Sequence, residues 1–243
     1  MQSKANYLSF AKKPDSERVL VLAPHPDDES IGCGGVLYQH YLAGEKITVV
    51  FLTDGCQGRY RRRISEEKIV KQRKEEAKKA AVILGIQNII FWNYKDGELC
   101  SNEESIMRMR ELIATITPDV VYLPYFVDEH EDHWATNKIF LEACSKITYR
   151  FKVCAYEVWT PLIPNYLVNI TKQMDKKLEA LECYKTQIEL FNIAEIAENL
   201  NAFRARRIRL KSYRYAEAFF SCEIEEYRYL FNKTFNGKNN KLK

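Results

Sequence analysis

Five short apolar runs, rich in β-branched residues, recur along the first two thirds of the chain. Each is continuously apolar instead of alternating with polar residues, as the run RVLVLA at 18–23 illustrates. Continuous apolar runs of this length are typical of parallel strands that helices cover on both faces. The predicted strands are Arg18 to Ala23, Ile47 to Thr53, Asn88 to Trp92, Asp119 to Leu123 and Lys152 to Trp159.

Longer segments with a helical period separate these runs. Gly85 and Pro118 follow two of them, and both residue types commonly end helices. The alternation of strand and helix predicts an α/β fold, a Rossmann-like three-layer sandwich around a mostly parallel sheet. The predicted helices are Ser30 to Leu42, Ser65 to Leu84, Glu103 to Ile116 and His133 to Ser145.

The last third of the chain has a different pattern. Residues 171–191 and 193–220 are mostly of helical type, and a proline-rich stretch precedes them. No flexible linker separates this part from the rest, so we expect a helical C-terminal extension packed on the same domain. The sequence thus predicts one domain over residues 1–235, with 236–243 as a disordered tail.

Composition narrows the class of protein. The chain has 243 residues, 46% hydrophobic and 29% charged, which excludes a disordered or fibrous protein. The net charge of +4 is too small to require a nucleic-acid partner. Seven cysteines without a C-x-x-C pair indicate free thiols in a reducing compartment, and no apolar run approaches the roughly 18 residues of a membrane span. We expect a cytoplasmic enzyme or binding protein of unknown oligomeric state.

Chemically capable side chains gather directly after the first predicted strand. The segment PHPDDE at 24–29 contains His25, Asp27 and Asp28. It lies at the carboxyl end of a parallel strand, where open α/β sheets bind their ligands. His25 and Asp28 are candidate metal ligands, although either aspartate could instead cap the helix that follows.

A second cluster, HEDH at 130–133, follows another predicted strand, so that the two segments hold three of the four histidines in the chain. They can meet across the top of the sheet. A catalytic zinc takes three protein ligands and leaves a position for water, and His25, Asp28 and His133 supply that set. Asp27 and His130 then remain as the base for water and as the cation or acid near the developing oxyanion.

Two further motifs have simpler interpretations. IGCGG at 31–35 does not match G-x-G-x-x-G and follows acidic residues that would repel a pyrophosphate, so close packing of a helix on the sheet is favoured over a nucleotide site. The alternative of a nucleotide-binding protein, such as a methyltransferase, would also give the HEDH motif no role. The basic run Arg59 to Arg63 is interpreted as a solvated loop, with a contact to an anionic substrate group as the alternative.

At PHPDDE followed by HEDH, the sequence resembles the LmbE/PIG-L family of metal-dependent N-acetylglucosaminyl deacetylases. The resemblance implies that His25, Asp28 and His133 bind the metal, which is zinc with iron(II) as the alternative. It also implies that Asp27 is the general base and His130 the acid or oxyanion partner. It covers nearly the whole chain, through TDG at 53–55, YEVWTPL at 156–162, KTQ at 185–187 and YAEAF at 215–219.

The same resemblance implies roles for three other residues. Asp132 would orient His130, as carboxylates commonly hold histidines at metal sites. Arg73 and Asp96 match positions where relatives contact sugar hydroxyls or a substituent on the sugar. Many relatives have a glutamate where this chain has Cys56, which removes a substrate contact and leaves the exact sugar open.

The sequence therefore predicts a zinc-dependent hydrolase that removes the acetyl group from an N-acetylglucosamine-type amino sugar on a soluble conjugate. Relatives that act on membrane phosphatidylinositol sugars usually carry an N-terminal membrane segment, which is not visible here. One alternative is a metal-dependent hydrolase of another N-acyl amide. The other is a non-catalytic sugar-binding protein on the same scaffold, which would need neither a free carboxylate nor a free histidine beside the metal.

Overall fold

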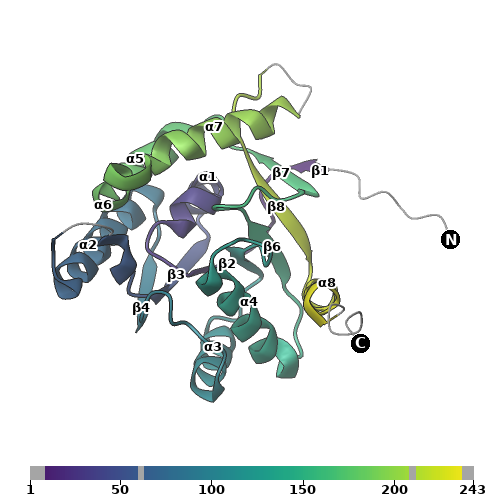
Figure 1. Cartoon of the computed structure of the whole chain (residues 1–243). Coiled ribbons are helices and arrows are strands. Elements are labelled where there is room, and N and C mark those ends of the chain that lie inside the picture. Colours follow the sequence, from purple (N-terminus) through teal and green to yellow (C-terminus); the bar gives the residue numbers. More distant parts are fainter. Residues whose placement is uncertain (1–8, 60–62, 208–211, 237–243) are drawn as a thin grey trace, which may run out of the picture.

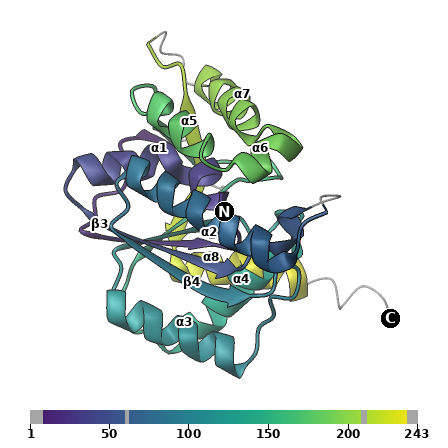
Figure 2. The same ribbon diagram turned by 90° about the vertical axis from the view of Figure 1, so that its left-hand side faces the viewer.

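The computed structural model describes residues 9–59, 63–207 and 212–236. In this part of the chain eight strands form one sheet in the order β1-β7-β8-β6-β5-β2-β3-β4. Figures 1 and 2 show helices α1, α2, α5, α6 and α7 on one face of the sheet and α3, α4 and α8 on the other. The predicted three-layer α/β sandwich with a mostly parallel sheet is confirmed. No helix among the described residues is long and apolar enough to cross a membrane.

The strands are β1 Ser9–Ala11, β2 Arg18–Ala23, β3 Lys46–Thr53, β4 Asn88–Tyr94, β5 Val120–Pro124, β6 Lys152–Tyr156, β7 Tyr166–Asn169 and β8 Ala216–Glu223. The helices are α1 Asp28–Leu42, α2 Glu66–Leu84, α3 Glu103–Ile116, α4 Glu131–Ala143, α5 Met174–Leu181, α6 Lys185–Phe191, α7 Ile193–Arg206 and α8 Ile224–Asn236. Two 3-10 turns, η1 Cys56–Arg59 and η2 Cys144–Lys146, complete the structure.

Strand β2 lies at the centre of the parallel part of the sheet, between β3 and β5. Its residues Val19 and Val21 pack into the core under α1, whereas Leu20 and Leu22 pack into the core on the other face. All four side chains are fully buried. This burial on both faces is the physical reason for the continuous apolar pattern, because neither face of the strand meets water.

Helix α1 packs unusually close to its neighbours at IGCGG. A Cβ at Gly32 would lie 2.2 Å from the ring of Tyr156, and one at Gly35 would lie 2.8 Å from Ile170. Only a hydrogen can occupy these positions without moving the neighbours. The interpretation of IGCGG as a close-packing motif is confirmed.

The last third of the chain differs in part from its prediction. Helices α5, α6 and α7 are present, but the prediction of helix through Phe220 is wrong, because Ala216–Glu223 forms β8. This strand is antiparallel to both β6 and β7. The periodicity of a short apolar run such as AEAFF does not distinguish a buried strand from a helix. Pairing with β6 decides that this segment is a strand. The run predicted as a strand to Trp159 ends at Tyr156, and the predicted tail beyond Asn236 lies outside the described residues.

Candidate metal centre

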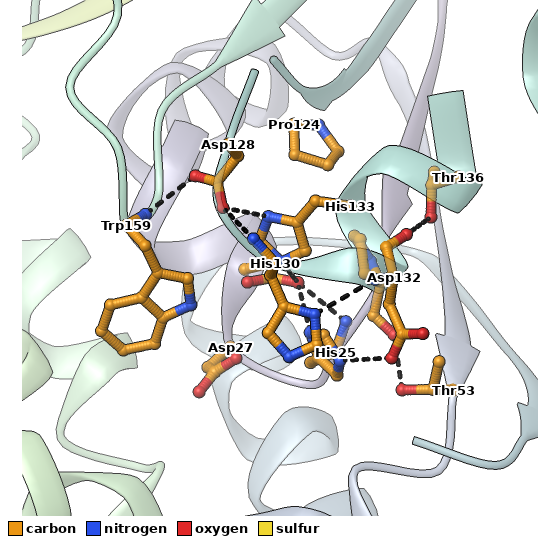
Figure 3. Close-up of polar contacts among 12 residues, drawn as sticks. His25, Asp27, Thr53, Pro124, Asp128, His130, Asp132, His133, Thr136 and Trp159 are labelled. Carbon is orange, nitrogen blue, oxygen red and sulfur yellow. Dashed lines mark hydrogen bonds and ion pairs between the residues drawn. The ribbon is translucent and has the colours of Figure 1, made fainter. Parts of the chain in front are cut away.

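The two histidine-containing segments meet at the carboxyl edge of the sheet. PHPDDE follows β2, HEDH follows β5, and these strands are paired in parallel. The ring centroid of His25 lies 4.4 Å from that of His130 and 5.4 Å from that of His133. Figure 3 shows the three rings grouped at the start of α4. The structure therefore brings together the side chains that the sequence analysis selected.

Asp28 lies between two histidines, close enough to each of them to share a metal ion with it. Its Oδ2 atom is 3.3 Å from Nδ1 of His25 and 3.3 Å from Nε2 of His133. Ligands at 2.0–2.1 Å from a tetrahedral zinc lie about 3.3 Å from one another. All three side chains are buried, and neither ring nitrogen of His133 makes a hydrogen bond of normal geometry. These residues fit a zinc ion.

The opposite ring nitrogens of both histidines contact carboxylates. Nε2 of His25 is 3.0 Å from Asp132 and 3.2 Å from Asp96, and Nδ1 of His133 is 3.0 Å from Asp128. Metal-binding histidines are usually held in this way, because the carboxylate fixes the ring and makes the free nitrogen a better ligand. The arrangement is a second indication of a metal site.

Other donor sets are close by. All ligand atoms lie within 4.8 Å of one another in the set His25, His130 and His133 and in the set His25, Asp96, His130 and Asp132, and neither set includes Asp28. Both sets include His130, which the sequence analysis kept free for catalysis. The choice between His130 and Asp28 as a ligand is therefore open to a direct test.

The centre is strongly negative apart from its histidines. Burial would lower the pKa of His133, but Asp28 and Asp128 outweigh it and raise this pKa to about 9. Burial also opposes protonation of His25, whose pKa is nevertheless held well above its usual value by Asp132 and Asp28. The two histidines in turn hold the pKa of Asp28 well below its usual range, against the effect of burial. Such a site favours a cation, either protons or a metal.

Asp27 stands apart from this network with a strained backbone. It precedes α1 with φ 137° and ψ −26°, and its side chain makes no capping hydrogen bond. A non-glycine residue with this conformation costs free energy and is most often found at functional sites. Its carboxylate is 3.2 Å from Arg73, yet burial raises its pKa to about 7 in spite of this cation. Asp27 is thus a carboxyl group, paired with Arg73, that can exchange a proton near neutral pH.

His130 is held by the first turn of α4. Its Nδ1 accepts a hydrogen bond from the main-chain N–H of Asp132 at 3.1 Å. In the neutral ring the proton is then on Nε2. Burial, together with His25 and His133, lowers the pKa of His130, which favours this neutral form.

Asp132 contacts His130 through its main-chain N–H, and its predicted role in orienting His130 stays a prediction, whereas the contacts of its carboxylate are with other groups. That carboxylate contacts His25 and accepts the N–H groups of Gly97 at 2.8 Å and Leu99 at 3.2 Å. Helix α4 begins at Glu131, and its first turn directs the Asp132 side chain towards the β2 segment and its main-chain N–H towards His130. Asp132 therefore contacts both histidines, but through different groups.

Sequence reasoning missed Asp128. Besides contacting His133, it accepts main-chain N–H groups from Trp159 at 3.0 Å and Thr160 at 3.1 Å. The only signal for it in the sequence is its place in the acidic run DEHEDH at 128–133. Nothing in the sequence shows that it meets the loop after β6.

Arg73 and Asp96 line the same cavity, with most of their polar groups engaged by the protein. Arg73 donates to the carbonyl oxygens of Pro26 at 2.6 Å and Gly55 at 3.1 Å. Asp96 accepts the N–H of Gln57 at 3.0 Å. Their roles as sugar contacts stay predictions.

The centre opens into a cavity of about 650 Å³. His25, Asp27, Asp28 and His130 lie in its wall. Arg59, at the edge of the basic run, pairs with Glu66 on an exposed surface, whereas residues 60–62 lie outside the described part. The remaining lining residues, apart from Arg73 and Asp96, are Gln57, Gly58, Glu129, Trp159, Gln187, Leu190 and Phe191.

The protein is of the α/β class, with a mostly parallel sheet and a candidate metal centre at the carboxyl edge of that sheet. Residues 20–144, just over half of the chain, match the family model described as PIG-L, GlcNAc-PI de-N-acetylase. The chain belongs to this family. The match includes both segments of the centre, PHPDDE and HEDH.

Three similar proteins have been assigned activities. The diacetylchitobiose deacetylase of Thermococcus kodakarensis is 29% identical over 191 residues, which cover 71% of each chain. The solved structure of the N,N'-diacetylchitobiose deacetylase from Pyrococcus horikoshii has a TM-score of 0.78 and 26% identity, covering 88% of this chain and 86% of that one. The 4-carboxy-2-hydroxymuconate hydratase of Pseudomonas putida has a TM-score of 0.74 and 25% identity, covering 84% and 95%. The same scaffold thus serves both a deacetylase and a hydratase.

Proposed function

We propose that this protein is a metal-dependent deacetylase that releases acetate from an N-acetylglucosamine-type sugar on a small conjugate. One observation carries the proposal. Asp28 lies 3.3 Å from both His25 and His133, and the cavity that this cluster faces is also lined by the Asp27 carboxyl group and the His130 imidazole. Family membership and the two chitobiose deacetylases support acetyl as the acyl group that is removed and released as acetate.

His25, Asp28 and His133 are the residues that would hold the metal, zinc or alternatively iron(II). When bound, the metal would polarise the acetyl carbonyl and lower the pKa of water, so that water can attack at neutral pH. Asp128 and Asp132 keep the two imidazole rings in place through the contacts described above. The protein supplies the geometry and the proton transfers.

Asp27 takes the proton from the attacking water. Its pKa of about 7 matches a base that works at neutral pH, because it is ionised often enough to accept the proton and basic enough to hold it. Arg73 keeps the carboxylate in one orientation through the 3.2 Å contact. Once protonated, Asp27 can return the proton to the leaving amine.

His130 stabilises the oxyanion that forms on the acetyl carbonyl. Its Nδ1 is occupied by the N–H of Asp132, so its Nε2–H is the group that can donate to this oxygen. Arg73 and Asp96 are the candidate contacts for the sugar itself, because both line the cavity beside these residues. The substrate is a small molecule, and no nucleic-acid partner is required.

The test measures bound metal and acetate release together. Purified protein is analysed for metal and assayed on N-acetylglucosamine and N,N'-diacetylchitobiose, with and without a chelator. We expect bound metal and acetate release that the chelator abolishes and added zinc or iron(II) restores. Metal without acetate from any N-acetylated sugar would contradict the proposal and favour another N-acyl amide or a hydration reaction. A protein that binds no metal after reconstitution would contradict the whole centre.

Three variants, at His133, His130 and Asp28, decide the ligand set. His133→Ala should lose the metal, because it removes one of the proposed ligands, whereas His130→Ala should retain it and lose most of its turnover. Metal content per protein chain and acetate release are measured on the same samples. If instead His130→Ala loses the metal and Asp28→Ala keeps it, the three histidines are the ligands.

A further inference from the structure

Two aromatic side chains line the cavity together with residues of the metal centre. Trp159 comes from the loop after β6 and Phe191 from the end of α6. Their ring centroids are 5.6 Å apart at an interplanar angle of 68°. Phe191 is 52% exposed, although burial of a large apolar side chain is favourable in free energy. We refer to this pair as the aromatic wall.

The aromatic wall is tied to the metal centre through the main chain. The N–H of Trp159 donates to Oδ2 of Asp128, whose Oδ1 contacts Nδ1 of His133. Figure 3 draws Trp159 together with His130 and Asp27, and all three residues line the same cavity. The contacts from Trp159 through Asp128 to His133 therefore fix the position of the indole relative to the metal centre. A substrate that touches both the indole and the metal centre would be held in one orientation.

The cavity has the size of a typical small-molecule site. Its volume of about 650 Å³ is within the range of about 300–1,000 Å³ for sites that enclose drug-sized ligands, which are larger than a single sugar ring. The face of a pyranose that carries axial C–H groups is apolar, and it gains free energy when it covers an aromatic ring. Gln57, Gln187 and Glu129 line the same cavity, and their side chains can form hydrogen bonds with the hydroxyl groups of a sugar.

The charge of the wall also selects the ligand. Among the described lining residues, Arg73 is the one lysine or arginine, and it is already paired with Asp27. Glu129 is an exposed carboxylate at the same cavity. Beside the Glu129 carboxylate, a neutral ring is favoured over a carboxylate or phosphate group, which Glu129 would repel.

From these observations we infer that the aromatic wall is a subsite for a second, neutral sugar ring, linked to the ring that loses its acetyl group. This inference rests on the proposed deacetylase function and extends it, since it makes a saccharide of two or more rings the preferred substrate. Trp159 supplies the stacking face, and Phe191 closes its outer side.

The test compares one ring with two. In the metal-loaded enzyme, Trp159→Ala should lower kcat/KM for N,N'-diacetylchitobiose about tenfold, mainly through a higher KM, because the stacking contact is lost. Its kcat/KM for N-acetylglucosamine should stay within about twofold, since the main-chain bond to Asp128 survives this substitution. Trp159→Phe keeps an aromatic face and should retain most of the disaccharide activity. Phe203→Ala, at an exposed phenylalanine of α7 outside the cavity, is the control and should change neither substrate.

The outcomes separate the subsite from the reaction. Equal loss on both substrates, or no loss on either, would overturn the subsite while leaving the deacetylase in place. If the wild-type enzyme releases no acetate from either sugar, the proposed function fails. Calorimetric titration with the disaccharide then still tests the subsite. Tighter binding to wild type than to Trp159→Ala supports it, and equal or absent binding overturns it.

Discussion

At the scale of single residues, Asp27 combines three features that are rarely found together. Its backbone is strained, its side chain caps nothing, and its buried carboxyl group has a pKa raised to about 7. A carboxylate whose task was structural would sit in a relaxed conformation and accept main-chain hydrogen bonds. The surrounding structure maintains a costly arrangement, which is typical of a residue whose position is needed for chemistry.

Asp27→Asn should leave the metal bound and reduce turnover by about 10²- to 10⁴-fold, because the amide cannot accept the proton from water. Acetate release and metal content are measured on the same preparation. The melting temperature serves as a control for the loss of the contact with Arg73. Turnover close to that of wild type would remove Asp27 from the mechanism.

Asp128→Asn should weaken metal binding by about 10- to 100-fold, because an amide no longer makes the His133 ring a strong ligand. The measurement is the metal dissociation constant from competition with a chelating dye. Glu129→Gln is the matched control, since its exposed carboxylate is not paired with a histidine in the described structure and its loss should not change metal affinity. An unchanged affinity in Asp128→Asn would show that the contact with His133 does not support the ligand.

At the scale of elements, the helix that carries the first half of the centre is broken and held by a buried ion pair. Cys33 has φ −144° and ψ 15° inside α1. The N–H groups of Gly35 and Val36 therefore donate to Glu217, each at 2.8 Å, and Lys177 donates to the carbonyl of Ile31 at 2.7 Å. Lys177 and Glu217 also contact each other at 2.7 Å with no exposure to solvent. The pair satisfies the polar groups that the kink releases.

Glu217→Gln should destabilise the fold by about 3–5 kcal/mol, because it leaves the ammonium group of Lys177 buried without a counter-charge. The free energy of unfolding is measured in urea. The control is Glu179→Gln, which breaks an exposed ion pair with Lys176 on α5, the helix that also carries Lys177. It should have a much smaller effect on the free energy of unfolding. Similar losses in both variants would contradict a special role for the buried pair.

At the scale of the whole molecule, a second histidine network joins α1 to the sheet far from the centre. His40 is fully buried, and the hydroxyl of Tyr122 in β5 lies 2.8 Å from its Nε2. Its Nδ1 contacts Glu45, which also pairs with Lys13. Burial lowers the pKa of His40 to about 4, although Glu45 opposes this effect. The native state thus favours neutral His40.

The unfolded chain, in which the pKa of His40 is about 6.5, binds a proton before the native state does. The contribution of His40 to stability is therefore complete above pH 6.5 and is lost as the pH falls towards 4, by up to about 3 kcal/mol. We expect the difference in unfolding free energy between wild type and His40→Gln to shrink between pH 7.5 and pH 4.5. Comparing the two proteins cancels the opposite effect of His25 and His133, whose raised pKa values stabilise the native state at low pH. A pH-independent difference would show that His40 has an ordinary pKa.

How far the sequence predicts each element depends on the origin of its pattern. Strands β2 to β6 and helices α1 to α4 follow from local apolar periodicity and from stop signals such as Gly85. Strand β8 does not, because its eight residues become a strand only by pairing between β6 and β7. The short strands β1 and β7 likewise form only by pairing, β7 with β8 and β1 with β7.

By itself, the sequence determined which chemical groups are available and that two strand ends carry them. His25, Asp27, Asp28, His130 and His133 all follow from the two motifs and their places after strands. Tertiary structure alone decided the partners of these groups. The carboxylate of Asp132 reaches His25, Asp128 reaches His133 and the loop of Trp159, and Phe191 meets Trp159. Such contacts join segments far apart in the chain, and their geometry depends on how the loops pack above the sheet, which no local pattern of residues records.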